Sequence, residues 1–435
     1  MPSPATTGSV LLGLLLLPSL HSQDITLEHG SEAPAAGWIA LPYVFSSETW
    51  DLAFGIAGGD SGWPSDNATT YAAATASTNE TWNIAAGGVS WPGLLSDRLL
   101  VDPFGTYADF TNLRVYVPGN PAFVDDPDRA GSNDSDPANF FRESSEEIWL
   151  QARFRYILPI GDTRESPERV FRVDKGMLLP SEEKHPAWNP LASGRTSLLV
   201  RPYYRKQDVE IPLIDDPYAF ETLNVRIGLE YDNRDFPSNP ARGSYQQIAL
   251  TRDWGALGET DSWTFGEIEL GKYFDLGASS VFRQQVIGLN AWTGYSFTWN
   301  EIDVPGLAFP VAVNRPPYYT GATLGGQDRM RGYPAARFNG RAASYFSAEY
   351  RVIPRWTPFS VAGIDEMLDM DWWQISLFFE AGRVSDSLDA ELYYEDLKYD
   401  VGVDLRFFVR KAVVRVGVAA SEETVQVVAM FGQPF

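Results

Sequence analysis

The sequence contains no cysteine and little positive charge. Without cysteine the chain cannot build a disulfide framework, so its stability must come from strand or helix pairing and from packing. Only 34 lysines and arginines oppose 57 aspartates and glutamates, which gives a formal net charge of −23. This charge argues against nucleic acid as a partner, because nucleic-acid phosphates require basic counter-charges.

Long apolar runs are also scarce. Residues 10–20 form a short run near the N-terminus, interrupted by Gly13, Pro18 and Ser19. A helix of that length is too short to cross a hydrocarbon layer of about 30 Å, so we predict that residues 1–23 are a secretory signal. We further predict a short periplasmic segment at 24–37 and one membrane domain at 38–435.

Residues suited to catalysis are few. Beyond the predicted signal only His29 and His185 remain as histidines, and the chain has no G-x-S-x-G nucleophile elbow. The acidic stretch 125–136 has Ala130 where a calcium loop needs a ligand, and Pro137 stands where the bidentate glutamate belongs. We therefore expect no enzymatic activity and no metal or other cofactor.

Alternation of apolar and polar residues with period two is abundant. In residues 222–232, Leu223, Ile227 and Leu229 share one face, whereas Asn224 and Glu230 share the other. Strands of nine to eleven residues with one apolar and one charged face are typical of a barrel with lipid outside and a wet lumen. A soluble sandwich would more often use shorter strands. The mean hydropathy of −0.21 is compatible with a barrel, because lumen residues offset lipid-facing ones.

Sixteen such segments predict an all-β fold, a 16-stranded antiparallel transmembrane β-barrel. Residues 159–193 fit no strand pattern. The last strand ends near the terminal aromatic Phe435, which suits a membrane interface. The predicted strands are 38–45, 51–57, 70–77, 81–89, 105–116, 148–156, 194–205, 222–232, 243–253, 262–273, 281–297, 341–353, 372–383, 399–409, 411–420 and 424–433.

A motif in the long segment 298–340 carries a family resemblance. Residues 324–340 read LGGQDRMRGYPAARFNG. This stretch resembles the barrel domain of the outer-membrane assembly superfamily typified by BamA and TamA, also called the bacterial surface antigen family. The hallmark of that family is a hydrophobic residue followed by Arg-Gly-Tyr or Arg-Gly-Phe. Met330, Arg331, Gly332 and Tyr333 match this hallmark, and Gly325 and Gly326 precede it. Three other parts of the sequence also match the family: Asp232, Arg234, Asp235 and Gly243 in residues 231–243, the stretch 378–382, and Phe435.

The resemblance implies that the segment between strands 11 and 12 folds into the lumen, where Arg331 pairs with acidic residues of the inner wall. The residues permit this pairing, because Glu349 and Glu380 occupy positions of their strands whose side chains are predicted to face the lumen. Gly325, Gly326 and Gly332 would serve the tight backbone path. The arginine would either simply neutralise lumen acids and hold the loop still, or take part in gating or substrate handling.

The first and last strands show a second feature. Pro42 lies in the first strand, and Gly432 and Phe435 lie at the end of the last. Proline lacks a donor and glycine is a weak strand former, so this lateral seam has weak pairing at both edges. In the resembled family the seam opens laterally, although edge prolines also occur at ordinary strand ends.

The resemblance implies a barrel of the Gram-negative outer membrane that assists insertion or translocation of proteins or lipid there. Family members normally carry periplasmic POTRA modules, for which the predicted segment 24–37 leaves no room. We therefore expect outer-membrane lipid as a neighbour and a separate POTRA-like or chaperone subunit as a partner. The alternatives are a passive pore and a lipid-handling surface antigen without protein clients.

Overall fold

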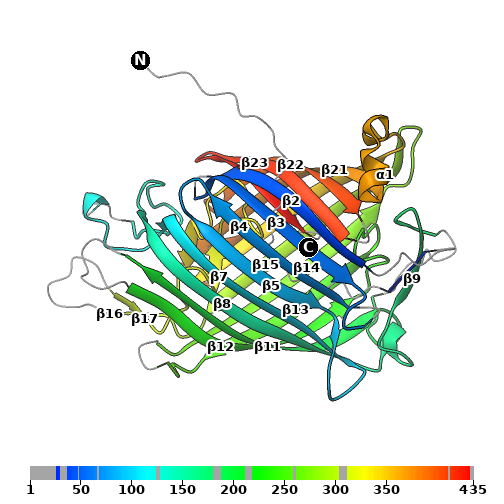
Figure 1. Cartoon of the computed structure of the whole chain (residues 1–435). Coiled ribbons are helices and arrows are strands. Elements are labelled where there is room, and N and C mark those ends of the chain that lie inside the picture. Colours follow the sequence, from blue (N-terminus) through cyan, green and yellow to red (C-terminus); the bar gives the residue numbers. More distant parts are fainter. Residues whose placement is uncertain are drawn as a thin grey trace.

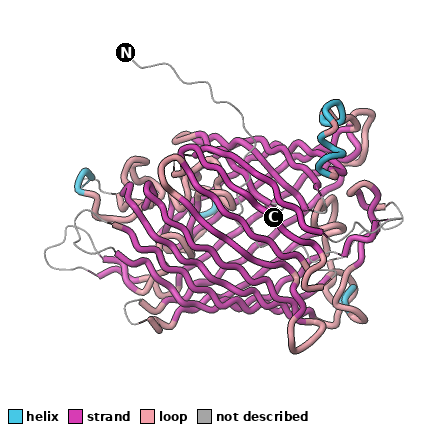
Figure 2. Tube along the Cα trace, in the orientation of Figure 1, coloured by secondary structure: helices cyan, strands magenta, loops and turns pink. Residues whose placement is uncertain are grey.

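The computed structural model describes residues 26–29, 37–47, 49–65, 68–123, 128–179, 188–210, 218–257, 261–302, 311–409 and 412–431. Their dominant feature is one closed antiparallel barrel of 16 strands (Figure 1), which confirms the predicted fold. Figure 2 shows that strand makes up almost the whole wall and that the short helices lie at the two ends. The predicted signal, Gly432 and Phe435 lie outside the described residues.

The barrel strands follow one another around the wall in chain order. Consecutive strands pair antiparallel, and β24 returns to lie beside β2. Several strands are longer than predicted, because they continue at the rims beyond the residues in which apolar and polar side chains alternate. The strands are β2 (Gly37–Ser47), β3 (Asp51–Ser61), β4 (Thr69–Ser77), β5 (Trp82–Val89) with its continuation β6 (Trp91–Pro92), β7 (Leu99–Val115), β8 (Phe141–Ile157), β11 (Arg195–Val209), β12 (Tyr218–Asp232), β13 (Gly243–Asp253), β14 (Trp263–Asp275), β15 (Phe282–Ser296), β20 (Ala342–Pro354), β21 (Met370–Ser385), β22 (Lys398–Val409), β23 (Ala412–Ser421) and β24 (Val425–Phe431).

The period-two pattern separates the two faces of the wall. On β22 the outward side chains of Val401 and Leu405 are exposed, whereas the inward Asp404 and Arg406 are buried. Apolar atoms on the outside and paired charges on the inside are the arrangement expected of a barrel in lipid. The inward charges of β22 avoid the cost of burial because they bind one another and the inserted loop described below.

One rim carries a small sheet that the sequence did not predict. Between β8 and β11 lie β9 (Val170–Asp174) and β10 (Met177–Leu178), and β1 (Thr26–His29) pairs in parallel with β9. Strands of two to five residues are too short for alternation to be recognised. Figure 1 places β9 beyond the same end of the barrel as α1 (Ile364–Leu368), which lies between β20 and β21.

The β9–β10 hairpin packs against the inner wall near this rim. Phe171 and Val173 belong to a buried cluster with the inward side chains of Trp372 and Phe408. The Trp372 and Phe408 rings stack with centroids 5.2 Å apart. The indole Nε1 of Trp372 donates a hydrogen bond of 2.9 Å to the carbonyl of Gly176 at the hairpin tip.

The opposite rim sends a long loop into the lumen. The segment that joins β15 to β20, the eleventh and twelfth barrel strands, is described for residues 297–302 and 311–341, and its later part, residues 318–340, folds inward as predicted. Its buried residues Leu324, Met330 and Phe338 pack with the inward Trp292 and Tyr345. The remaining short elements are β16 (Asn300–Ile302), β17 (Val311–Val313), β18 (Ala322–Leu324) and β19 (Phe338–Gly340) in this loop, and the 3-10 turns η1 (Pro121–Phe123), η2 (Gly161–Thr163), η4 (Phe359–Ala362) and η5 (Glu391–Tyr393).

Among the described residues, no helix has the length and apolar character needed to cross a membrane.

Candidate functional site in the barrel lumen

The motif in the inserted loop follows a tight backbone path. Gly325 and Gly326 have φ angles of +103° and +104°, which L side chains rarely adopt. The N–H of Gly325 donates to the carbonyl of Arg329, and the N–H of Gly326 donates to the carbonyl of Tyr333, each at 3.0 Å. A Cβ on Gly325 would lie 2.2 Å from the carbonyl oxygen of Pro334. The two glycines therefore let the chain close a compact turn that presents Arg331 to the wall.

Arg331 is fully buried and binds carboxylates from three neighbouring strands. Its Nε and backbone N–H donate to the two carboxylate oxygens of Glu380 on β21, at 3.0 and 2.6 Å. Nη1 donates to Asp404 on β22 at 2.9 Å, and Nη2 donates to Glu349 on β20 at 3.1 Å. The guanidinium also lies 3.5 Å from the ring centroid of Phe378. These charge-assisted bonds join the loop to β20, β21 and β22.

A second layer of arginines surrounds the same carboxylates. Arg406 donates to both oxygens of Glu349 at 2.8 Å, and Arg351 donates to Glu349 at 2.7 Å. Burial alone lowers the pKa of Arg331, but Glu380, Asp404 and Glu349 outweigh it and hold that pKa above its ordinary value. Arg331 is therefore charged at neutral pH.

Gly332 and Tyr333 complete the contact between the motif and the wall. The N–H of Gly332 donates to Asp400 at 3.1 Å, and its carbonyl accepts from the Ser421 hydroxyl at 2.8 Å. A Cβ on Gly332 would lie 2.6 Å from the Cβ of Asp400, so glycine alone fits. The hydroxyl of Tyr333 donates to the carbonyl of Tyr399 at 3.2 Å.

The loop also joins the segment between β7 and β8. Arg337 donates to the hydroxyl and carbonyl of Ser135 at 2.9 and 2.6 Å, and to Glu423 at 2.8 Å. Arg129 donates to the side chain and carbonyl of Asn339 at 2.9 and 2.6 Å. Sequence reasoning missed these contacts, because nothing in the sequence relates two loops about 200 residues apart.

The other predicted motif residues lie at the rim that carries β9, away from Arg331. Arg234 donates to both oxygens of Asp232, at 3.0 and 3.1 Å, in the turn between β12 and β13. One oxygen of Asp235 accepts three backbone N–H bonds of 2.9 to 3.1 Å from Phe236, Ala241 and Arg242. Gly243 closes the turn with a φ of +95°. This group therefore shapes a turn and forms no part of the Arg331 site.

The predicted lateral seam lies between β2 and β24, and of its three predicted residues only Pro42 is within the described part of the chain. Pro42 is an exposed residue of β2 that lies opposite Ile56 of β3. Gly432 and Phe435, the residues predicted for the other side, are outside the described residues.

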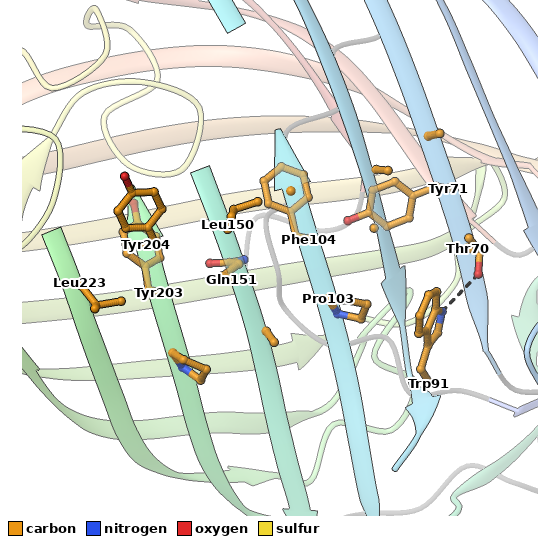
Figure 3. Close-up of a pocket in the computed structure, with 16 residues that line it drawn as sticks. Thr70, Tyr71, Trp91, Pro103, Phe104, Leu150, Gln151, Tyr203, Tyr204 and Leu223 are labelled. Atoms are coloured by element: carbon orange, nitrogen blue, oxygen red, sulfur yellow. Dashed lines mark hydrogen bonds between the residues drawn. The ribbon is translucent and has the colours of Figure 1, made fainter. Parts of the chain in front are cut away.

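Two hollows accompany the site. A lumen cavity of about 600 Å³ lies between the inserted loop and the wall that includes β8, β11 and β12. A second hollow of about 620 Å³ follows strands β4 to β12 and has no charged lining residue (Figure 3). Exposed Leu150 and Leu223 line it, and Nε1 of Trp91 donates to the hydroxyl of Thr70 at 3.1 Å.

Comparison with known proteins places this barrel in a family. Residues 197–409 match the Omp85 superfamily domain. Among solved structures, CdiB from Escherichia coli is similar with a TM-score of 0.53 at 11% identity, over 91% of this chain and 62% of that chain. BamA from Haemophilus ducreyi lacking POTRA domains 1-3 matches with a TM-score of 0.47 at 11% identity, over 91% of this chain and 68% of that one. No curated protein matches the chain in sequence. Residues 197–409 of this 16-stranded barrel are therefore identified as an Omp85 superfamily domain.

Proposed function

We propose that this barrel resides in the outer membrane of a Gram-negative cell and assists the insertion or translocation of polypeptides there. The observation that carries the proposal is the inserted loop, whose Arg331 binds Glu349, Glu380 and Asp404 on three adjacent strands. The Omp85 match supports the same general role. In this proposal the network locks the loop in the lumen and so keeps the wall in one working conformation. Catalytic activity forms no part of it.

A reconstitution experiment tests the proposal. The full chain is incorporated into liposomes, and a urea-unfolded outer-membrane barrel is diluted into the suspension as client. Folding of the client is measured on a gel, where an unheated folded barrel migrates differently from the same barrel unfolded by heating. We expect faster client folding than in empty liposomes, and a loss of that gain with Arg331→Ala. Arg355→Gln, which removes an exposed rim arginine, is the matched control.

The result that would contradict the proposal is equal client folding with and without the chain. Co-purification from mild detergent examines the predicted periplasmic partner, which stays a prediction from the sequence. A POTRA-bearing or chaperone-like subunit in the purified complex would support it, and a chain that purifies alone would count against it.

Lipid handling is the second candidate, favoured by the uncharged hollow along β4 to β12 (Figure 3). Deletion of the gene would then alter lipid asymmetry of the outer membrane while its protein content stayed normal. A passive pore is favoured only if the barrel shows high conductance that Arg331→Ala leaves unchanged, since an inserted loop should restrict ion flow.

A further inference from the structure

A row of three arginines crosses the inner wall on the side away from Arg331's carboxylates. Arg201 on β11 lies directly opposite Arg226 on β12. Arg153 on β8 lies at the same level, between the paired residues Phe154–Val200 and Gln151–Tyr203. Neighbouring strands are about 4.8 Å apart, so three positive charges lie close together. Like charges directly opposite one another destabilise a sheet unless something compensates them.

Only the outer two arginines of the row have carboxylate partners in the structure. Arg153 binds Glu230, and Arg226 binds Glu267 at 3.1 Å. Within the described part of the chain, Arg201 makes no hydrogen bond or ion pair, and its Nε is buried without a partner. Its guanidinium lies 5.4 Å from the ring centroid of Tyr203, a cation–π contact that supplies no full negative charge. The middle of the row therefore has a positive charge with no carboxylate bound directly to it, although Glu267 attracts it through space.

The next inward row along the same strands also has unused hydrogen-bonding groups. Gln151, Tyr203 and Asn224 are paired across β8, β11 and β12. Gln151 is only 7% exposed, yet neither its Nε2 nor its Oε1 has a partner among the described residues. The Oδ1 of Asn224 is likewise buried and unpaired there. Buried polar groups in folded proteins are nearly always satisfied, so an unsatisfied pair beside an unbalanced arginine points to a ligand.

Both rows face the lumen cavity of about 600 Å³. Besides Arg331, six arginines and four carboxylates line this cavity, although the chain as a whole has a net charge of −23. Trp149, Trp263 and Trp292 supply apolar lining. A cavity of this size takes a small organic molecule, and this balance of charge selects an anion.

We propose that the lumen cavity binds a phosphate ester, with the phosphate on Arg201 and Gln151 and the organic part against the tryptophans. A phosphate offers several acceptor oxygens in a tetrahedral arrangement, and a guanidinium binds such oxygens by charge-assisted, often bidentate, hydrogen bonds. The amide of Gln151 adds a neutral donor. The ester is either a soluble sugar phosphate or the headgroup of a phospholipid. This inference does not depend on the proposed role in protein insertion.

Isothermal titration calorimetry on the full chain in a non-ionic detergent, which carries no phosphate, tests the proposal. Glucose 6-phosphate represents the soluble source, short-chain phosphatidylglycerol represents the lipid source, and glucose and short-chain diacylglycerol are the matched neutral probes. We expect saturable binding of at least one phosphate probe and none of its neutral counterpart. Whichever phosphate probe binds identifies the source. Absence of binding by both phosphate probes, or equal binding of a neutral probe, would overturn the proposal.

Single substitutions test whether Arg201 and Gln151 bind the phosphate. Arg201→Gln should weaken binding about tenfold or more, because it removes a charge-assisted bond to the phosphate. Arg201→Lys should restore part of the affinity, and Arg355→Gln at the rim should have no effect. Gln151→Leu should weaken binding several-fold and provides a second measurement if Arg201→Gln does not fold. Wild-type affinity in the folded variant of either residue would overturn the assignment.

Discussion

Arg331→Ala is the sharpest perturbation of the inserted loop, because it removes one side chain that three strands share. The substitution deletes guanidinium bonds to Glu380, Asp404 and Glu349. A hydrogen bond to a charged group contributes about 1.5–3 kcal/mol, but bonds made by one group are not additive. Removing one member of a buried ion pair costs about 3–5 kcal/mol, since it leaves the other charge uncompensated.

The second layer of arginines limits this cost. Arg351 and Arg406 continue to neutralise Glu349, and Arg406 also binds Asp404, so the uncompensated charge is mainly that of Glu380. We therefore expect Arg331→Ala to lower the free energy of unfolding by about 3–5 kcal/mol, at the upper end only if Glu380 stays ionised. The double variant Arg331→Met with Glu380→Gln should lose less than Arg331→Met alone, because it removes both charges.

Urea unfolding of the barrel in lipid vesicles measures the free energy, and limited trypsin digestion measures release of the loop. Arg337 is only 1% exposed and should become cleavable when the loop leaves the wall. Arg355→Gln is the control for loss of one arginine. The reasoning would be refuted by a change below about 1 kcal/mol together with unchanged protection of Arg337.

Three further predictions address other parts of the fold. Gly332→Ala should release the loop as Arg331→Ala does, because the new Cβ would lie 2.6 Å from the Cβ of Asp400. Gly271→Ala is the control, since a Cβ there would have its nearest neighbour 3.6 Å away. Equal protection of the two variants from trypsin would contradict the steric argument. Gly176→Ala should free the β9–β10 hairpin from the wall, because the new Cβ would lie 2.6 Å from the Phe408 ring and Gly176 has a φ of +64°. Release of the hairpin should raise the single-channel conductance of the barrel. Unchanged trypsin cleavage after Lys175 would show that the hairpin stays in place. Backbone amides in residues 38–45 and 424–433 should exchange hydrogen faster than those of other barrel strands, and uniform protection would remove the argument for a labile seam.

The sequence predicted the barrel well because the signal repeats in every strand. Each wall residue faces either lipid or lumen, so an error of one position would place charges such as Asp404 outside. The same parity identified Glu349 and Glu380 as lumen residues, and the structure places both within hydrogen-bond distance of Arg331. Local alternation thus carries the information that a barrel of this kind requires.

What the sequence could not supply is the relation between distant strands. The side chains of Asp404 and Arg406 face the lumen, as alternation predicts, but only the register of β20 to β22 brings Arg406 to Glu349 and Asp404 to Arg331. The alignment of Arg153 with Arg201 and Arg226 likewise depends on pairing between β8, β11 and β12. The sequence did not predict the β9–β10 hairpin for a different reason: its strands are too short to show any alternation of apolar and polar residues.

The two inserted segments use the same side of the wall, and this has a mechanical consequence. The motif loop binds β20, β21 and β22 through Arg331, and Arg415 of β23 donates to the loop carbonyl of Gln327 at 3.3 Å. At the other rim the β9–β10 hairpin packs on Trp372 of β21 and Phe408 of β22.

These strands lead directly to β24, which meets β2 at the seam. The loop even reaches the β23–β24 turn, where Arg337 binds Glu423. A displacement of β23 and β24 away from β2 must therefore break loop contacts or carry the loop along. If the seam opens as the resemblance implies, and the loop does not move with the strands, we expect opening of the seam and release of the loop to be linked equilibria, because a state that favours one then lowers the free-energy cost of the other.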